Sequence, residues 1–95
     1  MGGWRLEFHR KAKKELEKLD TPTQIFIVRS LEAFIDAYDS EYERQMIRRG
    51  NIKALKGEWQ GFYRLRLRNY RVIYEKIGDR LVIHILRIAH RREVY

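Results

Sequence analysis

The run GFYRLRLRNYRVIY, residues 61–74, alternates apolar and charged side chains over most of its length. Such period-two alternation is typical of strands that bury one face, and Arg68-Asn69 interrupts it in the middle. The run therefore predicts a β-hairpin in which Arg68-Asn69 forms a two-residue loop. With this loop, tyrosine, leucine and valine share one face. The other face, which we call the arginine face, carries Arg64, Arg66 and Arg71.

Arginines gathered on one face of a sheet predict the binding of an anion. In this register Arg66 lies directly opposite Arg71, and like charges so placed destabilise a sheet by up to about 1 kcal/mol. Guanidinium groups bind phosphate through paired hydrogen bonds, which offsets this repulsion. The hairpin is therefore expected to bind phosphate groups through Arg64, Arg66, Arg71 and, in the loop, Arg68.

The last third of the chain predicts one more strand and a basic tail. We interpret Gly78-Asp79 as a two-residue hairpin loop that leads into a strand over residues 80–89. The pairs facing the core are then Val72 with Ile85 and Tyr74 with Ile83. The same parity places His90 on the arginine face, at the strand end nearest Arg66 and Arg71. The tail, which is expected to fold over this face, contains Arg91, Arg92 and Tyr95.

The first half of the chain predicts a strand and a helical hairpin. Residues 4–8 alternate as a half-buried strand, and over residues 9–19 the apolar positions recur every three or four residues, as in an amphipathic helix. Thr21 is the predicted N-cap of a second helix, with Pro22 in its first turn. The apolar stripe of this helix is expected to pack on the sheet through Ile25, Val28, Leu31, Ile35 and Tyr38.

A short third helix completes the predicted helical layer. Ser40 begins a second capping pattern, and Gly50-Asn51 is expected to end the helix near Arg49. Residues 52–60 are interpreted as a loop or an irregular strand. The sequence thus predicts an α+β domain in which an N-terminal strand, a helical hairpin and the third helix accompany a small antiparallel sheet, with the helices on one face.

The charge of the chain favours a polyanionic or acidic partner. The 95 residues are predicted to form a single domain, residues 1–95, with a net charge of +8. Residues 1–49 contain 10 Lys and Arg against 9 Asp and Glu, whereas residues 50–95 contain 11 against 4. Because the excess belongs to the half that contains the arginine face, we expect that half to contact a nucleic acid or an acidic protein.

No cofactor, metal or membrane is expected to take part. The chain has no cysteine, and its three histidines lack the spacing of metal ligands. No apolar run approaches the roughly 18 residues of a membrane span, and the N-terminus has no signal-peptide pattern. The sequence predicts a soluble, cytoplasmic protein.

Several guanidinium groups with one imidazole and one phenol suit metal-free cleavage of RNA. The reaction needs a base for the ribose 2′-OH proton, a donor for the leaving 5′-oxygen and cations around the phosphorane. Guanidinium charge favours the ionised form of a tyrosine, and histidine titrates near neutrality. His90 and Tyr95 are both candidates for the base, and the alternative for each is a ring that only packs against the sheet.

The runs LKGEWQGFYRLRLRNYRVIYE, residues 55–75, and AHRREVY, residues 89–95, resemble the RelE/ParE superfamily of toxins from prokaryotic toxin–antitoxin systems. The chain is most similar to the RelE branch, the ribosome-dependent mRNA interferases. The resemblance implies a RelE-like microbial RNase fold and an endoribonuclease that cuts mRNA in the ribosomal A site by 2′-OH attack, inhibiting translation. It also implies a cognate antitoxin, with which the toxin is expected to form a heterotetramer.

Matching positions assign roles by the same resemblance. Arg71 and Arg91 correspond to the residues that stabilise the phosphorane, whereas Tyr95 and His90 correspond to the candidates for the base. The predicted RNA-binding residues are Arg64, Arg66, Arg68 and Arg92. Two alternatives stay open, a ParE-like poison of DNA gyrase without nuclease activity and a non-enzymatic RNA-binding relative.

Overall fold

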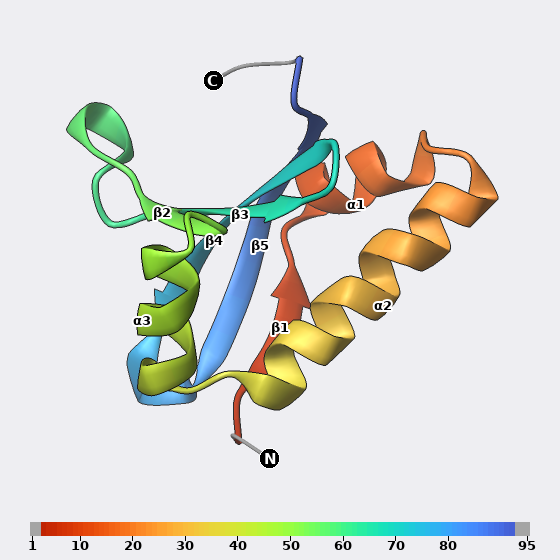
Figure 1. Ribbon diagram of the computed structural model, residues 1–95. Helices are drawn as coiled ribbons and strands as arrows, with labels where there is room; N and C mark the ends of the chain where they lie inside the picture. Colours follow the sequence, from red (N-terminus) through yellow and green to blue (C-terminus); the bar gives the residue numbers. More distant parts are fainter. Residues whose placement is uncertain (1–2, 93–95) are drawn as a thin grey trace.

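The computed structural model describes residues 3–92, which form helices packed on a five-stranded sheet (Figure 1). The strand order is β1-β5-β4-β3-β2, with β1 parallel to β5 and the other neighbours antiparallel. The elements are β1 (Arg5–Phe8), α1 (Arg10–Glu17), α2 (Thr21–Ala37), α3 (Ser40–Arg48), β2 (Ile52–Ala54), β3 (Tyr63–Leu67), β4 (Tyr70–Ile77) and β5 (Val82–His90). The predicted α+β class is confirmed, and β2 forms part of the segment predicted as a loop or irregular strand.

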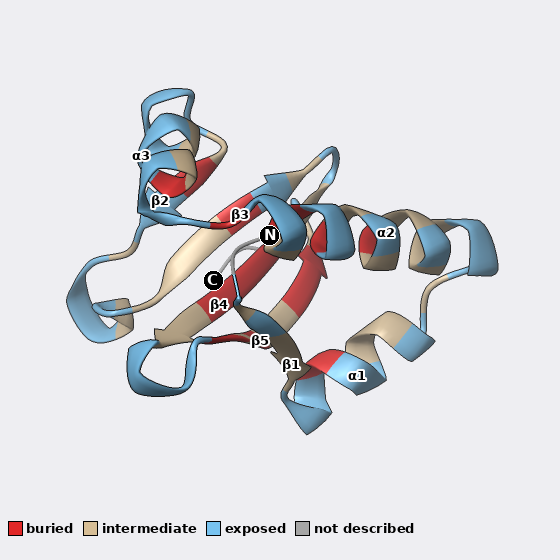
Figure 2. Ribbon diagram, turned by 90° about the horizontal axis from the view of Figure 1, so that it is seen from below, coloured by how far each residue is buried: buried red, intermediate tan, exposed pale blue. Residues whose placement is uncertain are grey.

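The helices divide between one face and one edge of the sheet. In Figure 2, α2 and α3 lie on the same side of the sheet. α1 packs beside β5, beyond the point where β1 ends at Phe8. The Glu15 carboxylate of α1 accepts a hydrogen bond of 2.8 Å from the amide of Ile88, so it satisfies a backbone donor at the edge of β5.

Both predicted helix caps lie one residue too late. Asp20 caps α2 by accepting a hydrogen bond of 3.1 Å from the amide of Thr23. Asp39 caps α3 in the same way, with a bond of 2.8 Å from the amide of Tyr42. Aspartate caps at least as well as the threonine or serine that follows it, so the residue type did not decide between neighbours.

The buried stripe of α2 differs in part from the predicted one. Ile27, Leu31, Phe34 and Tyr38 lie in the core, whereas Ile25 is 46% exposed. Apolar residues occupy more than one face of this helix, so their spacing alone did not select the side that packs on the sheet.

The predicted register of the β3–β4 hairpin is confirmed at every pair, from Leu67 with Tyr70 to Tyr63 with Tyr74. The loop consists of Arg68 and Asn69, and Arg68 has a φ of 54°, in the left-handed region. Side chains on each strand therefore lie on the faces that the alternation predicted.

The predicted β4–β5 loop is wrong. Residues 78–81 connect Ile77 to its partner Val82, and Leu81 adopts the left-handed conformation. A register shift also lies between Ile73 and Tyr74, because Tyr74 pairs with Ile85 but Ile73 pairs with Arg87. Because of this bulge, the side chains of β5 that follow it lie on the face opposite to the one predicted.

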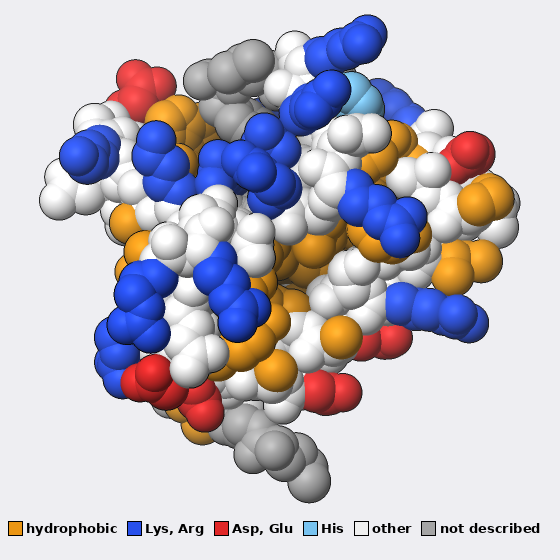
Figure 3. Space-filling model, viewed as in Figure 1, with side chains coloured by type: hydrophobic (Ala, Val, Ile, Leu, Met, Phe, Trp, Pro, Cys, Tyr) orange, Lys and Arg blue, Asp and Glu red, His pale blue; other side chains and the backbone are white. Residues whose placement is uncertain are grey.

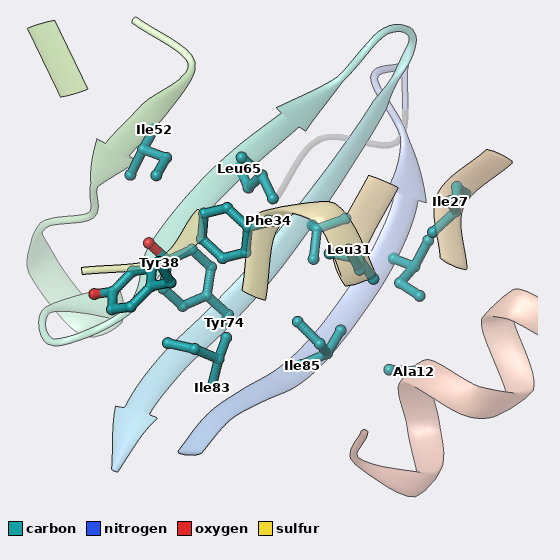
Figure 4. Close-up of a cluster of buried hydrophobic side chains, with 12 residues drawn as sticks. Ala12, Ile27, Leu31, Phe34, Tyr38, Ile52, Leu65, Tyr74, Ile83 and Ile85 are labelled. Carbon is teal, nitrogen blue, oxygen red and sulfur yellow. The ribbon is translucent and has the colours of Figure 1, made fainter. Parts of the chain in front are cut away.

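The core lies between the sheet and the helices α2 and α3. Figure 4 shows Phe34 and Leu31 of α2 directed toward Leu65, Tyr74 and other side chains of the strands. The rings of Phe34 and Tyr74 are 5.7 Å apart, and Tyr63 stacks on Tyr74 at 5.3 Å. Aromatic packing therefore joins α2 to the end of the β3–β4 ladder that is farthest from its loop.

A buried carboxylate fastens α3 to the same hairpin. Glu43 is 7% exposed, and its Oε2 accepts hydrogen bonds from the hydroxyls of Tyr38 (2.8 Å) and Tyr74 (2.9 Å). Its Oε1 accepts from Lys76 Nζ at 2.8 Å. Burial lowers the pKa of Lys76, but the bond to Glu43 and its charge outweigh burial and leave that pKa raised.

Replacing Glu43 with alanine is expected to lower the free energy of unfolding by about 3 kcal/mol, because two hydroxyls and an ammonium group lose their acceptor. Urea unfolding followed by tryptophan fluorescence measures the change. Glu41→Ala is the matched control, since the Glu41 side chain is 59% exposed and its loss should change stability little. Equal stability of the two variants would contradict this role of Glu43.

The tyrosines of this cluster predict a loss of stability at alkaline pH. Burial, followed by the bond to Glu43, raises the pKa of Tyr38 from 10.0, and burial with the Glu43 charge raises the pKa of Tyr74. Unfolded tyrosines ionise above about pH 10, whereas the folded state keeps both protonated. The contribution of the two tyrosines to the free energy of unfolding is therefore fully present below about pH 10. Above that pH it falls by up to about 1.4 kcal/mol per pH unit for each tyrosine. Urea midpoints that stay constant between about pH 9 and pH 11 would contradict this.

Candidate active site

Three arginines share the face of the sheet turned away from α2 and α3. Arg64 and Arg66 belong to β3 and Arg71 to β4, and Arg66 pairs with Arg71 across the strands. The alternation places them opposite the buried side chains of Leu65 and Val72. The predicted arrangement of the arginine face is therefore confirmed.

The arginine face carries positive charge that is partly removed from water. Burial, and then the charges of Arg71 and Arg66, lower the pKa of Arg64. Arg64 Nη2 donates to the carbonyl of Gly50 at 3.1 Å, but its Nε is buried and has no hydrogen-bond partner. Within the described residues, neither Arg64 nor Arg66 forms an ion pair with a carboxylate. An anion bound here would offset the repulsion between the arginines and would give the buried Nε of Arg64 a hydrogen-bond acceptor.

The chain returns to the arginine-bearing hairpin after β5. The amide of Arg91 donates a hydrogen bond of 2.6 Å to the carbonyl of Asn69, so the residues after β5 lie beside the β3–β4 loop. Ala89, two residues before Arg91, pairs with Arg71 on the arginine face. Arg91 and Arg92 are exposed there. Tyr95, the other predicted residue of the tail, lies outside the described residues.

Arg68 lies apart from the arginine face, although it belongs to the same hairpin. Its guanidinium carbon lies 4.3 Å from the centre of the Phe26 ring of α2, in a cation–π contact. The left-handed backbone of the loop turns this residue to the side of the helices. Figure 3, which shows that side, has Lys and Arg side chains gathered above a hollow lined with hydrophobic ones.

The predicted position of His90 on the arginine face is wrong. Because of the bulge in β5, His90 pairs with Tyr70 and shares its face, toward the helices. The two rings meet edge-on at 5.3 Å, with 79° between their planes. Nδ1 of His90 also accepts a hydrogen bond of 3.2 Å from the amide of Arg92. The imidazole therefore lies at the same end of the sheet as the arginine face, but on the opposite side.

The model of a family described as the ParE toxin of the type II toxin–antitoxin system parDE matches residues 6–95. The chain belongs to this toxin family. A search of curated proteins with the sequence found no match. The predicted membership of the RelE/ParE superfamily and the prediction of a toxin of a toxin–antitoxin system are confirmed.

Solved RelE structures have the fold of this ParE-family toxin. The RelBE2 toxin–antitoxin complex from Mycobacterium tuberculosis matches at 26% identity and a TM-score of 0.68, over 93% of this chain and 98% of that chain. An archaeal RelE–RelB complex from Pyrococcus horikoshii OT3 matches at 27% identity and a TM-score of 0.68, over 97% and 99%. The intact E. coli RelBE complex, at 24% identity and a TM-score of 0.66 over 92% and 95%, shows the fold alone.

The toxin has a second imidazole near the arginines, but farther along the strands. His84 Nδ1 lies 3.0 Å from Glu75 Oε2. Glu75 follows Arg71 by four residues of β4, which places it about 13 Å farther along the strand, too far to share one phosphate. Within residues 3–92, no group of three or more His, Asp or Glu side chains is placed to hold a metal ion. The described helices include none long and apolar enough to cross a membrane.

The sequence did not predict the ion pair that Arg87 of β5 forms with Glu15 of α1. Arg87 lies in the row of Arg64 and Ile73, and Glu15 of α1 accepts from its Nε at 2.9 Å and forms an ion pair with its Nη2 at 2.8 Å. The sequence offered no signal for this contact, because Glu15 sits among lysines on a helix face that appeared solvated. The ion pair neutralises Arg87, so Arg87 contributes less than Arg64, in the same row, to the positive charge of this face.

Proposed function

We propose that this toxin is a ribosome-dependent endoribonuclease that cleaves mRNA in the ribosomal A site. The observation that carries the proposal is the arginine face, where one hairpin gathers three guanidinium groups and the amide of Arg91 is bonded beside its loop. Such an arrangement matches an RNA phosphate on which charge develops during the reaction.

In the proposed reaction the RNA supplies its own nucleophile. The ribose 2′-hydroxyl attacks the adjacent phosphorus, Arg71 and Arg91 stabilise the phosphorane oxygens, and the bond to the 5′-oxygen breaks. The products are a 2′,3′-cyclic phosphate and a 5′-hydroxyl end. Arg64, Arg66 and Arg92 contact the neighbouring phosphates, whereas Arg68 contacts RNA from the side of the helices.

The base of this reaction is assigned to Tyr95. An arginine stays protonated and is a poor base, and the imidazole of His90 faces the helices, away from the phosphate site. The phenolate of Tyr95 takes the 2′-OH proton, and the phenol then returns a proton to the departing 5′-oxygen. The guanidinium groups favour the phenolate, which is the form present before the first proton transfer and after the second.

An antitoxin is the proposed protein partner of the toxin. The relatives from M. tuberculosis and P. horikoshii were solved as complexes with their antitoxins. We expect an acidic segment of the partner to neutralise the arginine face and an apolar one to cover exposed side chains such as Ile25 and Ile47 in a heterotetramer. Co-purification with the product of the adjacent gene tests this. A toxin that binds no such product would contradict it.

A gyrase poison is the second candidate, because the family model that matches is that of ParE. Two assays separate the candidates. Primer extension on mRNA bound to ribosomes is expected to show toxin-dependent cuts in the A site, and DNA supercoiling by gyrase is expected to proceed normally. Intact message together with blocked supercoiling would overturn the nuclease in favour of the poison.

A further inference from the structure

Two hollows flank Tyr70 on the side of the helices, at the end of the sheet nearest the arginine face. One, of about 290 Å³, lies between the end of α1 and the end of β5 and is lined in part by Lys18, Leu19, Tyr70 and His90. The other, of about 240 Å³, lies between α2 and the β3–β4 loop and is lined in part by Phe26, Arg68 and Tyr70. Tyr70 thus forms a wall of both.

The rings around the larger hollow offer surfaces for a flat ligand. Tyr70 and His90 stand nearly perpendicular, with 79° between their planes, so a planar group stacked on one ring meets the edge of the other. The hydrogen bond from the amide of Arg92 to Nδ1 fixes the orientation of His90. In a neutral His90 the proton consequently resides on Nε2.

The ammonium group of Lys18, at the rim of the larger hollow, can donate hydrogen bonds to the acceptor atoms at the edge of a nucleobase. Lys18 is exposed, and within the described residues it forms no ion pair. Glu15, the acidic residue of the same hollow, is occupied by Arg87 and by the amide of Ile88. The donors of Lys18 are therefore available for acceptors such as O6 and N7 of guanine.

The larger hollow and the phosphate site lie on opposite faces of the sheet, at the same end of the strands. Tyr70 and Arg71 are successive residues of β4, so their side chains point to opposite faces. A nucleotide whose phosphate lies on the arginine face can turn its base past the strand end toward Tyr70. Proteins commonly hold unpaired RNA bases in this splayed way, stacked on aromatic side chains.

We propose that Tyr70, His90 and Lys18 form a subsite for one unpaired nucleobase next to the phosphate bound by the arginine face. The inference rests on the proposed RNA cleavage for the position of that phosphate. It assigns His90 to the recognition of the base rather than to proton transfer.

Binding without cleavage gives the first test. The probe is a single-stranded RNA trinucleotide whose 2′-hydroxyls are methylated, titrated into the free toxin at low salt. The His90→Ala variant, which loses a stacking surface, and the Lys18→Ala variant, which loses a donor to the base edge, are each expected to bind it at least about 5-fold more weakly. Lys13→Ala is the control for charge, because Lys13 lies on α1, the helix that Lys18 caps, is exposed and lines neither hollow. Equal affinities of Lys13→Ala and the two subsite variants would overturn the subsite.

Cleavage on ribosomes gives the second test and separates the subsite from the proposed function. For His90→Ala we expect a reduced preference among A-site bases and a higher toxin concentration for half-maximal cleavage, with the shape of the pH profile retained. Loss of one limb of that profile would make His90 a proton-transfer group and overturn the inference. If the wild type cleaves no message yet binds the trinucleotide through His90 and Lys18, the nuclease proposal fails and the subsite stands.

Discussion

Arg71→Ala is expected to slow cleavage of mRNA on ribosomes by roughly 10²- to 10³-fold, the usual effect of removing one group that stabilises developing charge. Arg71 lies opposite Arg66 and pairs on its other side with Ala89, two residues before Arg91, so its loss removes the centre of the cationic site. The side chain lies on the face away from the core of Tyr74 and Phe34, and folding should be preserved. Single-turnover primer extension measures the rate.

Arg29→Ala is the matched control for Arg71→Ala. It removes the same charge from an exposed position on α2, on the other side of the sheet, and should leave cleavage unchanged. Arg71→Lys keeps the charge but loses the paired hydrogen bonds, so an intermediate rate is expected. Equal rates for Arg71→Ala and Arg29→Ala would contradict the proposal that the arginine face stabilises the phosphorane.

Tyr95→Phe is expected to slow cleavage by roughly 10²- to 10⁴-fold, the usual contribution of a positioned acid or base. The substitution keeps the ring and removes only the hydroxyl that exchanges protons with the RNA. The wild-type rate should rise with pH as the phenol ionises, and the residual rate of the variant should lose this dependence. Single-turnover cleavage at several pH values measures both effects.

Tyr42→Phe makes the same chemical change elsewhere in the toxin. The Tyr42 ring packs against Phe34 in the core, far from the proposed reaction, so its loss of a hydroxyl should leave the rate unchanged. If Tyr95→Phe cleaves as fast as Tyr42→Phe, the base is another group, and the assignment to Tyr95 is wrong.

The part of the fold that the sequence predicted depends on local alternation. Residues 63–71 alternate apolar and charged side chains on both sides of a two-residue loop, so every pair of the hairpin and the arginine face could be predicted. The β4–β5 connection could not, because Leu81 adopts a left-handed backbone that its residue type disfavours. The bulge opposite Ile73 and Tyr74 has no signature in the alternation, since apolar residues occupy both faces of β5.

The wrong prediction for the face of His90 follows from that bulge. One extra residue in β5 moves His90 to the side of the helices, while the adjacent Arg91 reaches the β3–β4 loop through its amide. Side-chain contacts between segments that are far apart in the sequence could not be predicted either. The pairing of Glu15 with Arg87 and of Glu43 with two tyrosines depends on how the helices pack, and a single sequence does not encode this in any periodic pattern.

The most direct measurement is cleavage of ribosome-bound mRNA that carries either a ribose or a single 2′-deoxyribose at the A-site position of the cut. We expect a cut with a 2′,3′-cyclic phosphate end in the first message and no cut in the second, because the second message lacks the attacking hydroxyl. Equal cutting of the two messages, or no cutting of either, would contradict the proposed mechanism.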